Sequence, residues 1–144
     1  QALTRNTNLL VDTLVGPAGG PGTRTMLYEN AAFVAATTVS GQSLMTSCHS
    51  ASGGSIPRHA SGLDSKICGE VTHAVRGMTR AEANEIVEQI IPLYVDDLEK
   101  KPIGKPFEEV YDIDKVEPTP EWQGMYDEVR DELIKMGLPL DRLV

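Results

Sequence analysis

The segment DTLVGPAGGPGTRTMLYENAAFVAATTV, residues 12–39, decides the expected fold, because it joins a short apolar run to a longer helical pattern through a loop of small residues. Asp12–Val15 is predicted to be a strand, since the run is short and ends at a Gly-Pro pair. Gly16–Gly22 mixes prolines with glycines and is therefore predicted to be a loop. Met26–Val39 is predicted to be a helix, in which alanines leave one flank small enough to pack closely on a sheet.

A second unit repeats this order further along the chain. Ser43–Cys48 is predicted to be a strand, His49–His59 a loop of small residues, and Ser61–Gly77 a helix that ends at its glycine. Two parallel strands alone leave both outer edges of the sheet unpaired, so either further strands are hidden or the chain contributes to a larger sheet. We favour the second interpretation. The fold class is therefore α/β: the last strands and helices of a (β/α)8 TIM barrel, followed by a C-terminal helical extension.

The extension divides the chain into final barrel units, residues 1–78, and a helical part, residues 79–144. Its predicted elements are a helix from Arg80 to about Lys100 with a kink or break at Pro92, a linker over Lys101–Pro106, a short mixed segment over Phe107–Val116, and a helix from Thr119–Pro120 to Gly137. The expected helix caps are Thr23 or Thr25 for the first helix, and capping boxes of Ser61 with Asp64 and of Thr79 with Glu82.

The composition excludes several classes of protein. The 144 residues are 40% apolar and 24% charged, as in folded soluble domains, and runs such as Ala31–Ala36 fall far short of the roughly 18 residues of a membrane span. A net charge of −8, whose acidic excess falls in residues 61–144, argues against nucleic-acid binding. Two cysteines make no disulfide framework and Gln1–Asn8 lacks the layout of a signal peptide, so we expect a cytoplasmic protein. The missing initiator Met leaves open that the sequence is a processed or excised piece.

Two loops form the candidate site, because loops that follow parallel strands line the active sites of barrel enzymes. The residues expected to line the substrate cavity are Gly16, Ala18, Gly19 and Gly20 after the first strand, and Ser47, Cys48 and His49 after the second. The N–H groups of Gly16–Thr25 could instead hold a phosphate, although the Gly-Lys-Ser/Thr ending of a P-loop is missing. We favour a tight turn that lines a cavity.

Nucleophilic and metal chemistry have weaker support. Cys48 and His49 are adjacent on a strand and point to opposite faces, so a nucleophile–base pair would need a partner from elsewhere. The thiols and imidazoles of the chain belong to Cys48, His49, His59, Cys68 and His73. Their positions show no metal-ligand spacing, so no metal site is expected.

Two carboxylates lie on small or apolar helical faces, at Glu29 and Glu70. Burial could raise their pKa values. Pairing with Arg24 or Arg76 is the interpretation we favour.

Longer stretches of the sequence resemble one family. GPAGGPGTRTMLYENAAF (16–33), the spacing on to SGQSL (40–44), SASGG (50–54) and GLDSKICGEVTHA (62–74) are similar to the C-terminal third of the monomethylamine methyltransferase family. In the tail, LY (93–94), GKPFEEVYD (104–112), PTPEW (118–122) and MYD (125–127) recur in the same order. The similarity covers nearly the whole chain, and it rests on order and spacing rather than on one signature motif.

The resemblance implies a longer (β/α)8 barrel that assembles as a symmetric oligomer. Family members carry a pyrrolysine in the barrel mouth whose imine ring holds the methylamine, and the methyl group passes to the Co(I) centre of a separate corrinoid protein. The chain is then part of a methyltransferase acting on a methylated amine, with monomethylamine as the expected substrate. Pyrrolysine and the family's acidic active-site residue would lie upstream of Gln1, so no cofactor is expected to bind this segment directly. The implied partners are the corrinoid protein, the remainder of the barrel and further copies of the enzyme.

One departure from the family bears on specificity. The family's Gln and Tyr near the substrate would fall at about Leu14 and Gly16, where neither type stands. The methylated substrate therefore stays open, and no catalytic residue is assigned. Two other functions also stay open: a small non-enzymatic α/β association module, and a barrel enzyme that binds a phosphorylated substrate on the Gly16–Thr25 loop. We expect the segment to be inactive by itself.

Overall fold

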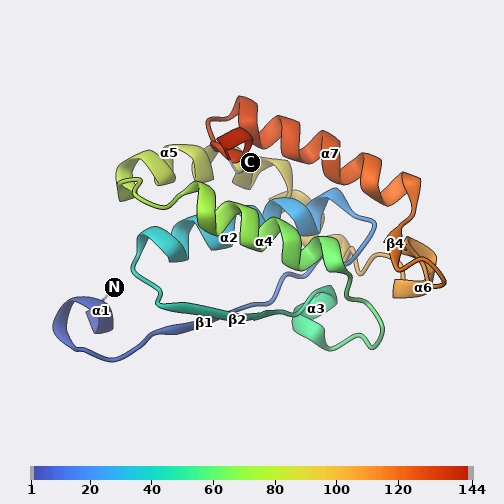
Figure 1. The fold of residues 1–144 in the computed structure, drawn as a ribbon, viewed down its shortest axis with the longest axis horizontal. Helices are drawn as coiled ribbons and strands as arrows, with labels where there is room; N and C mark the ends of the chain where they lie inside the picture. Colours follow the sequence, from blue (N-terminus) through green and yellow to red (C-terminus); the bar gives the residue numbers. More distant parts are fainter. Residues whose placement is uncertain (1, 143–144) are drawn as a thin grey trace.

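A computed structural model describes residues 2–142 of the chain (Figure 1). Its strands are β1 (Asp12–Val15), β2 (Leu44–Cys48), β3 (Tyr111–Asp112) and β4 (Glu117–Pro118). Its α-helices are α1 (Ala2–Asn6), α2 (Arg24–Val39), α3 (Ala51–Gly54), α4 (Gly62–Ala74), α5 (Arg80–Ile90), α6 (Phe107–Val110) and α7 (Pro120–Lys135). Its 3-10 turns are η1 (Ile91–Leu93), η2 (Val95–Lys100) and η3 (Leu140–Arg142).

The elements form three layers, as Figure 1 shows. The strands β1 and β2 lie below, α2 and α4 cover them, and α5 and α7 pack above α2. β1 and β2 are parallel, with Asp12 opposite Leu44 and Val15 opposite Cys48. The prediction of two successive parallel strand–loop–helix units is confirmed.

The sheet is covered on one face. Val15 points towards the helices and is 1% exposed, whereas its neighbour Leu14 points the other way and is 51% exposed. Leu44 on β2 is 55% exposed. Within residues 2–142, the open face of β1 and β2 therefore carries large apolar side chains that the described helices leave bare.

The core is centred on α2, which is buried on nearly every side because α4, α5 and α7 all contact it above the sheet. Alanines at positions 31, 32 and 35 allow this close approach. Trp122, Tyr126 and Leu133 of α7 complete the same core. Side chains from both 1–78 and 79–144 thus share one core, and the division between those two parts stays a prediction.

The helix boundaries follow local signals. Thr23, rather than Thr25, caps α2 by accepting the Met26 N–H at 3.3 Å. Both predicted capping boxes and the threonine cap of α7 are present. The expected long helix breaks before Pro92, where α5 gives way to 3-10 turns. Proline causes this break because it lacks an N–H and crowds the preceding turn.

Sequence patterns missed two short features. The antiparallel pair β3–β4 spans two residues on each side, which is too short for an alternating pattern. The helical turn α3 lies in the predicted 49–59 loop and contains left-handed backbone. The sequence pattern did not predict this turn. Within residues 2–142, no helix has the length and apolar character needed to cross a membrane.

Candidate functional site

The glycine loop (Gly16–Gly22) leaves β1 at its carboxyl end and leads into α2. The N–H groups of Ala18 and Gly19 donate to the two oxygens of the Glu29 carboxylate, at 3.0 and 2.8 Å. The next N–H, of Gly20, donates at 2.9 Å to a carbonyl of the linker that follows η2. A carboxylate of the protein itself therefore takes the position in which a phosphate-binding loop would hold its anion.

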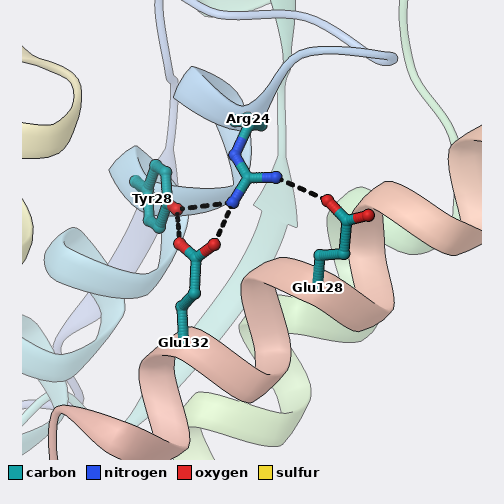
Figure 2. A network of polar contacts seen from close by, with 4 residues as sticks. All are labelled: Arg24, Tyr28, Glu128 and Glu132. Carbon is teal, nitrogen blue, oxygen red and sulfur yellow. Dashed lines mark hydrogen bonds and ion pairs between the residues drawn. The ribbon is translucent and has the colours of Figure 1, made fainter.

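Glu29 has a different partner from the one predicted. Burial raises the pKa of its carboxyl, and the two loop N–H groups oppose that shift. Arg24 instead forms ion pairs with Glu128 and Glu132 of α7, and it donates to the Tyr28 hydroxyl at 3.2 Å (Figure 2). Residues five apart lie on different faces of a helix, so Arg24 turns to α7 while Glu29 turns to the loop.

The prediction for Glu70 is wrong for a related reason. Its carboxylate accepts from the Arg130 guanidinium of α7 at 3.0 Å, and not from Arg76. Glu70 and Arg130 are far apart in sequence, so spacing within one helix could not reveal the pair. The ion pairs of Arg24 join α7 to α2, and the ion pair of Glu70 joins α7 to α4.

The second loop is bonded directly to the first. The successive N–H groups of Ala51, Ser52 and Gly53 donate to the carbonyls of Gly19, Ala18 and Pro17, at 2.8, 3.0 and 3.0 Å. The three donors have φ of 56°, 56° and 65°, a left-handed conformation that glycine adopts freely and that strains alanine and serine. This ladder holds the rims of β1 and β2 together, and we call it the loop ladder.

Two glycines of the first loop are required by close packing. A Cβ on Gly20 would lie 1.9 Å from the Ile103 carbonyl oxygen, and one on Gly19 would lie 2.7 Å from the Met26 nitrogen. Side chains at these positions would push the loop away from its neighbours. Ala18, Gly19 and Gly20 therefore fix the shape of the rim through their backbone.

The residues after β2 separate as adjacent strand residues should. Cys48 faces the helices, where its sulfur accepts from Asn30 Nδ2 at 3.3 Å. His49 is exposed, and its ring lies beside Gly54. Ser47 pairs with Leu14 of β1. The Cys48 side chain thus turns to α2, while the His49 ring turns to Gly54.

A buried carboxylate anchors the second loop. Asp64 is 1% exposed and accepts from the Ser50 hydroxyl and from the Ser61 N–H, the latter at 3.1 Å. Trp122 Nε1 donates to the Ser61 hydroxyl at 3.1 Å, which extends the network to α7. Burial raises the pKa of Asp64, and the serine donors oppose this shift. The capping-box spacing found this residue in the sequence, but it gave no sign of the contacts with Ser50 and α7.

Three of the predicted site residues border cavities: Gly16 lines one, and Cys48 and His49 line another. A groove of about 270 Å³ lies against β1, α2 and α5, and its wall includes Val15, Gly16, Glu29, Phe33 and Tyr94. A second cavity of about 280 Å³, which we call the β2 cavity, is lined by Cys48, His49, Ser50, Ile56, Arg58 and His59 among others. Across the described residues, 2–142, no group of three or more His, Cys, Asp or Glu side chains could hold a metal ion.

Comparison with known proteins bears directly on this arrangement. The family model described as monomethylamine methyltransferase MtmB matches residues 1–138. The chain belongs to the monomethylamine methyltransferase family. Monomethylamine methyltransferase MtmB2 of Methanosarcina acetivorans is 33% identical over 132 residues, which are 92% of this chain and 29% of that relative. The same shares and identity hold for MtmB of Methanosarcina mazei. The chain thus spans 29% of the length of these relatives.

Solved structures of the family agree with the fold. The crystal structure of Methanosarcina barkeri monomethylamine methyltransferase matches with a TM-score of 0.86 and 32% identity, over 93% of this chain and 29% of that one. A crystal structure of a hydroxylamine MtmB complex matches with the same values. The expectation that the two parallel units are the C-terminal strands and helices of a TIM barrel is confirmed.

Proposed function

We propose that this chain forms part of a methyltransferase that moves a methyl group from monomethylamine to the Co(I) centre of a cognate corrinoid protein. The observation that carries the proposal is the superposition on the M. barkeri enzyme, with a TM-score of 0.86 over 93% of the chain. Barrel enzymes place their active sites at the carboxyl ends of the strands, where the loop ladder lies. The corrinoid would supply the cobalt nucleophile that accepts the methyl group.

The described residues suit a wall of such a site rather than its reactive centre. Backbone N–H groups of the glycine loop are used by Glu29, and carbonyls of the loop are used by Ala51–Gly53. Groups held in this way keep the rim in one position and have little freedom to take part in proton transfer. Pyrrolysine would then come from polypeptide outside this sequence, and this chain would orient the substrate and limit the access of water.

The open face of the sheet supports a requirement for more of the barrel. Leu14 and Leu44 are exposed there, and the described part of the chain pairs β1 with β2 alone. Barrel strands are paired on both edges and covered on both faces. We propose that the remaining barrel covers these leucines, that the complete enzyme is a homo-oligomer that docks a corrinoid protein, and that it works in the cytoplasm.

The two alternatives are less well supported by the geometry. A phosphorylated substrate would have to displace Glu29 from Ala18 and Gly19, because those N–H groups already have an acceptor. If the chain were an independent association module, its membership of a methyltransferase family would be unexplained.

A segment exchange tests the proposal. The corresponding segment of the M. barkeri enzyme is replaced by this chain, in a host that inserts pyrrolysine, and methylation of the Co(I) corrinoid protein is followed by visible absorbance. The chimera is expected to use monomethylamine, whereas the enzyme lacking the segment is expected to be inactive. A chimera that folds and assembles but transfers no methyl group from mono-, di- or trimethylamine would contradict the proposal.

The same assay examines substrate choice. Leu14 and Gly16 stand about where the family is expected to have Gln and Tyr. A preference of the chimera for dimethylamine or trimethylamine would keep the reaction class but overturn monomethylamine as the substrate.

A further inference from the structure

A groove runs between α2 and α5. The groove of about 270 Å³ at the end of β1 is continued by a cavity of about 230 Å³, and Val87 of α5 lines both of them. We call the two together the α2–α5 groove. Glu29 lines the part next to β1, and Arg80 lines the other part. Among the described residues, 2–142, none from α4 or β2 belongs to either wall, so the groove lies on the side of α2 that α4 leaves free.

The walls of the α2–α5 groove have the spacing of helix faces. Wall residues stand at positions 29, 32, 36 and 40 along α2 and its C-cap, and at positions 80, 84 and 87 of α5. Steps of three or four residues keep side chains on one face of a helix. Ala32 and Ala83 line the groove as small residues that are at most 3% exposed, whereas Phe33 beside them stays 42% exposed. Such a surface fits one further helix, which small side chains allow to approach closely.

The connectivity of parallel sheets indicates which helix that is. β1 pairs with β2 on one edge, and its other edge has no partner within residues 2–142. α4 contacts both β2 and α2, so it lies on the β2 side of α2. Strand–helix–strand connections between parallel strands are right-handed, so a helix that leads into β1 from a preceding strand lies on the same face as α2. It lies beside α2 and opposite α4, which is the side of the α2–α5 groove.

We propose that the α2–α5 groove holds the helix of the barrel unit that precedes β1, and that α5 clamps this helix against α2. The chain spans 29% of the length of its relatives, so the complete enzyme has polypeptide to supply this helix. The inference rests on the proposed completion of the barrel but not on the reaction. It gives α5 a role that a barrel helix does not have, because residues from the 79–144 part then hold a barrel unit from outside this sequence.

The test measures how fast a maleimide modifies a thiol introduced into the groove. Ala36 is an exposed residue of the groove wall, and the matched control is Ala81, an exposed alanine of α5 that belongs to neither wall. In the 144-residue chain, the thiols of Ala36→Cys and Ala81→Cys are expected to react at similar rates. In the chimera with the M. barkeri enzyme, the thiol at position 36 should react at least about tenfold more slowly, and the thiol at position 81 should keep its rate. Peptide mapping by mass spectrometry separates these thiols from Cys48 and Cys68, and circular dichroism confirms that each variant is folded.

A photochemical cross-link identifies what fills the groove. Phe33→benzoylphenylalanine places the reactive ketone at the groove wall. The chimera carries a sense codon at the pyrrolysine position, and it is assembled from a mixture of unlabelled and nitrogen-15-labelled chains. A cross-link to the polypeptide before β1 within one isotopic form is expected. A cross-link that joins the two isotopic forms would show that a second copy fills the groove, and it would overturn the proposal.

The outcomes separate this inference from the proposed function. Equal rates at position 36 in the chain and in the chimera would overturn the inference, even if the chimera with pyrrolysine transferred methyl groups. Protection of position 36 in a chimera that transfers no methyl group would support the inference and contradict the proposed function. If the chimera does not assemble, the same substitutions are made at the matching positions of the M. barkeri enzyme, where an accessible thiol in the groove would overturn the proposal.

Discussion

The helical layers and the two-stranded sheet differ in how completely this chain covers them. Trp122, Tyr126 and Leu133 of α7 are at most 1% exposed, whereas Leu14 and Leu44 on the sheet are more than half exposed. A surface helix is satisfied when one apolar stripe is buried, but a barrel strand needs cover on both faces and partners on both edges. The chain therefore buries the apolar face of α7 with its own residues, whereas one face of its strand layer lacks cover from the described residues.

The largest effect is expected in the helical layer. Trp122→Ala removes a fully buried ring and the donor to Ser61, so the free energy of unfolding should fall by about 3–5 kcal/mol. Equilibrium urea unfolding of the 144-residue chain measures this change. A loss below about 1 kcal/mol would show that the helical layers are not the stable part of the chain.

The rim between the two layers should be nearly as sensitive. Gly20→Ala places a Cβ 1.9 Å from the Ile103 oxygen and is expected to cost about 1–3 kcal/mol. The matched control is Gly69→Ala in α4, where a Cβ would meet no atom within 4 Å. That helical substitution should stabilise the chain by about 0.5–1 kcal/mol. Equal effects of the two changes would remove the packing argument for the glycine loop.

The polar tie between α2 and α7 should contribute less. Glu132 accepts from Tyr28 and Arg24, chiefly Tyr28, and these bonds lower its pKa (Figure 2). Because the group is partly exposed, Glu132→Gln should cost only about 1 kcal/mol at neutral pH. A carboxyl with a lowered folded pKa stabilises the fold above its unfolded pKa, so the difference between wild type and variant should vanish as pH falls through the lowered value. Urea midpoints measured over a pH series check this prediction. A difference between wild type and variant that persists in acid would contradict it.

Glu29 should show the opposite pH dependence. Burial raises the pKa of its carboxyl, so its contribution is most favourable below the unfolded pKa and is lost as pH rises through the raised folded value. As the pH rises over this range, the free energy of unfolding of the wild type should therefore fall relative to that of Glu29→Gln, by no more than about 1 kcal/mol. The same pH series measures this change. If the wild type gained stability relative to Glu29→Gln as the pH rises, as is expected for Glu132, the burial argument would be contradicted.

The smallest effect is expected on the open face of the sheet. Leu14→Ala should change the unfolding free energy of the chain by less than about 0.5 kcal/mol, because the side chain is 51% exposed. In the complete barrel the same substitution should cost more, since further strands would cover it. A cost of several kcal/mol in the chain alone would break the comparison between the two layers.

Much of the fold could be predicted from short-range signals. The strand before Gly16, a threonine cap at Thr23 or Thr25 and the break at Pro92 each depend on a few neighbouring residues, and the structure contains all three, with Thr23 as the cap. The candidate site was harder to predict. The residues chosen after β1 and β2 lie at the ends of two parallel strands, and their role at a substrate cavity stays a prediction. Glu29 and Asp64 acquire their contacts from partners in other elements.

The sequence by itself determined the two strand–loop–helix units, both capping boxes and the family, because periodicity, glycine, proline and capping residues act within a few positions of one another. The tertiary structure alone decided the loop ladder, the partner of Glu29 and the contact of Ser50 with Asp64. Those contacts join residues whose separation along the chain carries no pattern, and the packing of α2 and α4 on the sheet brings them together.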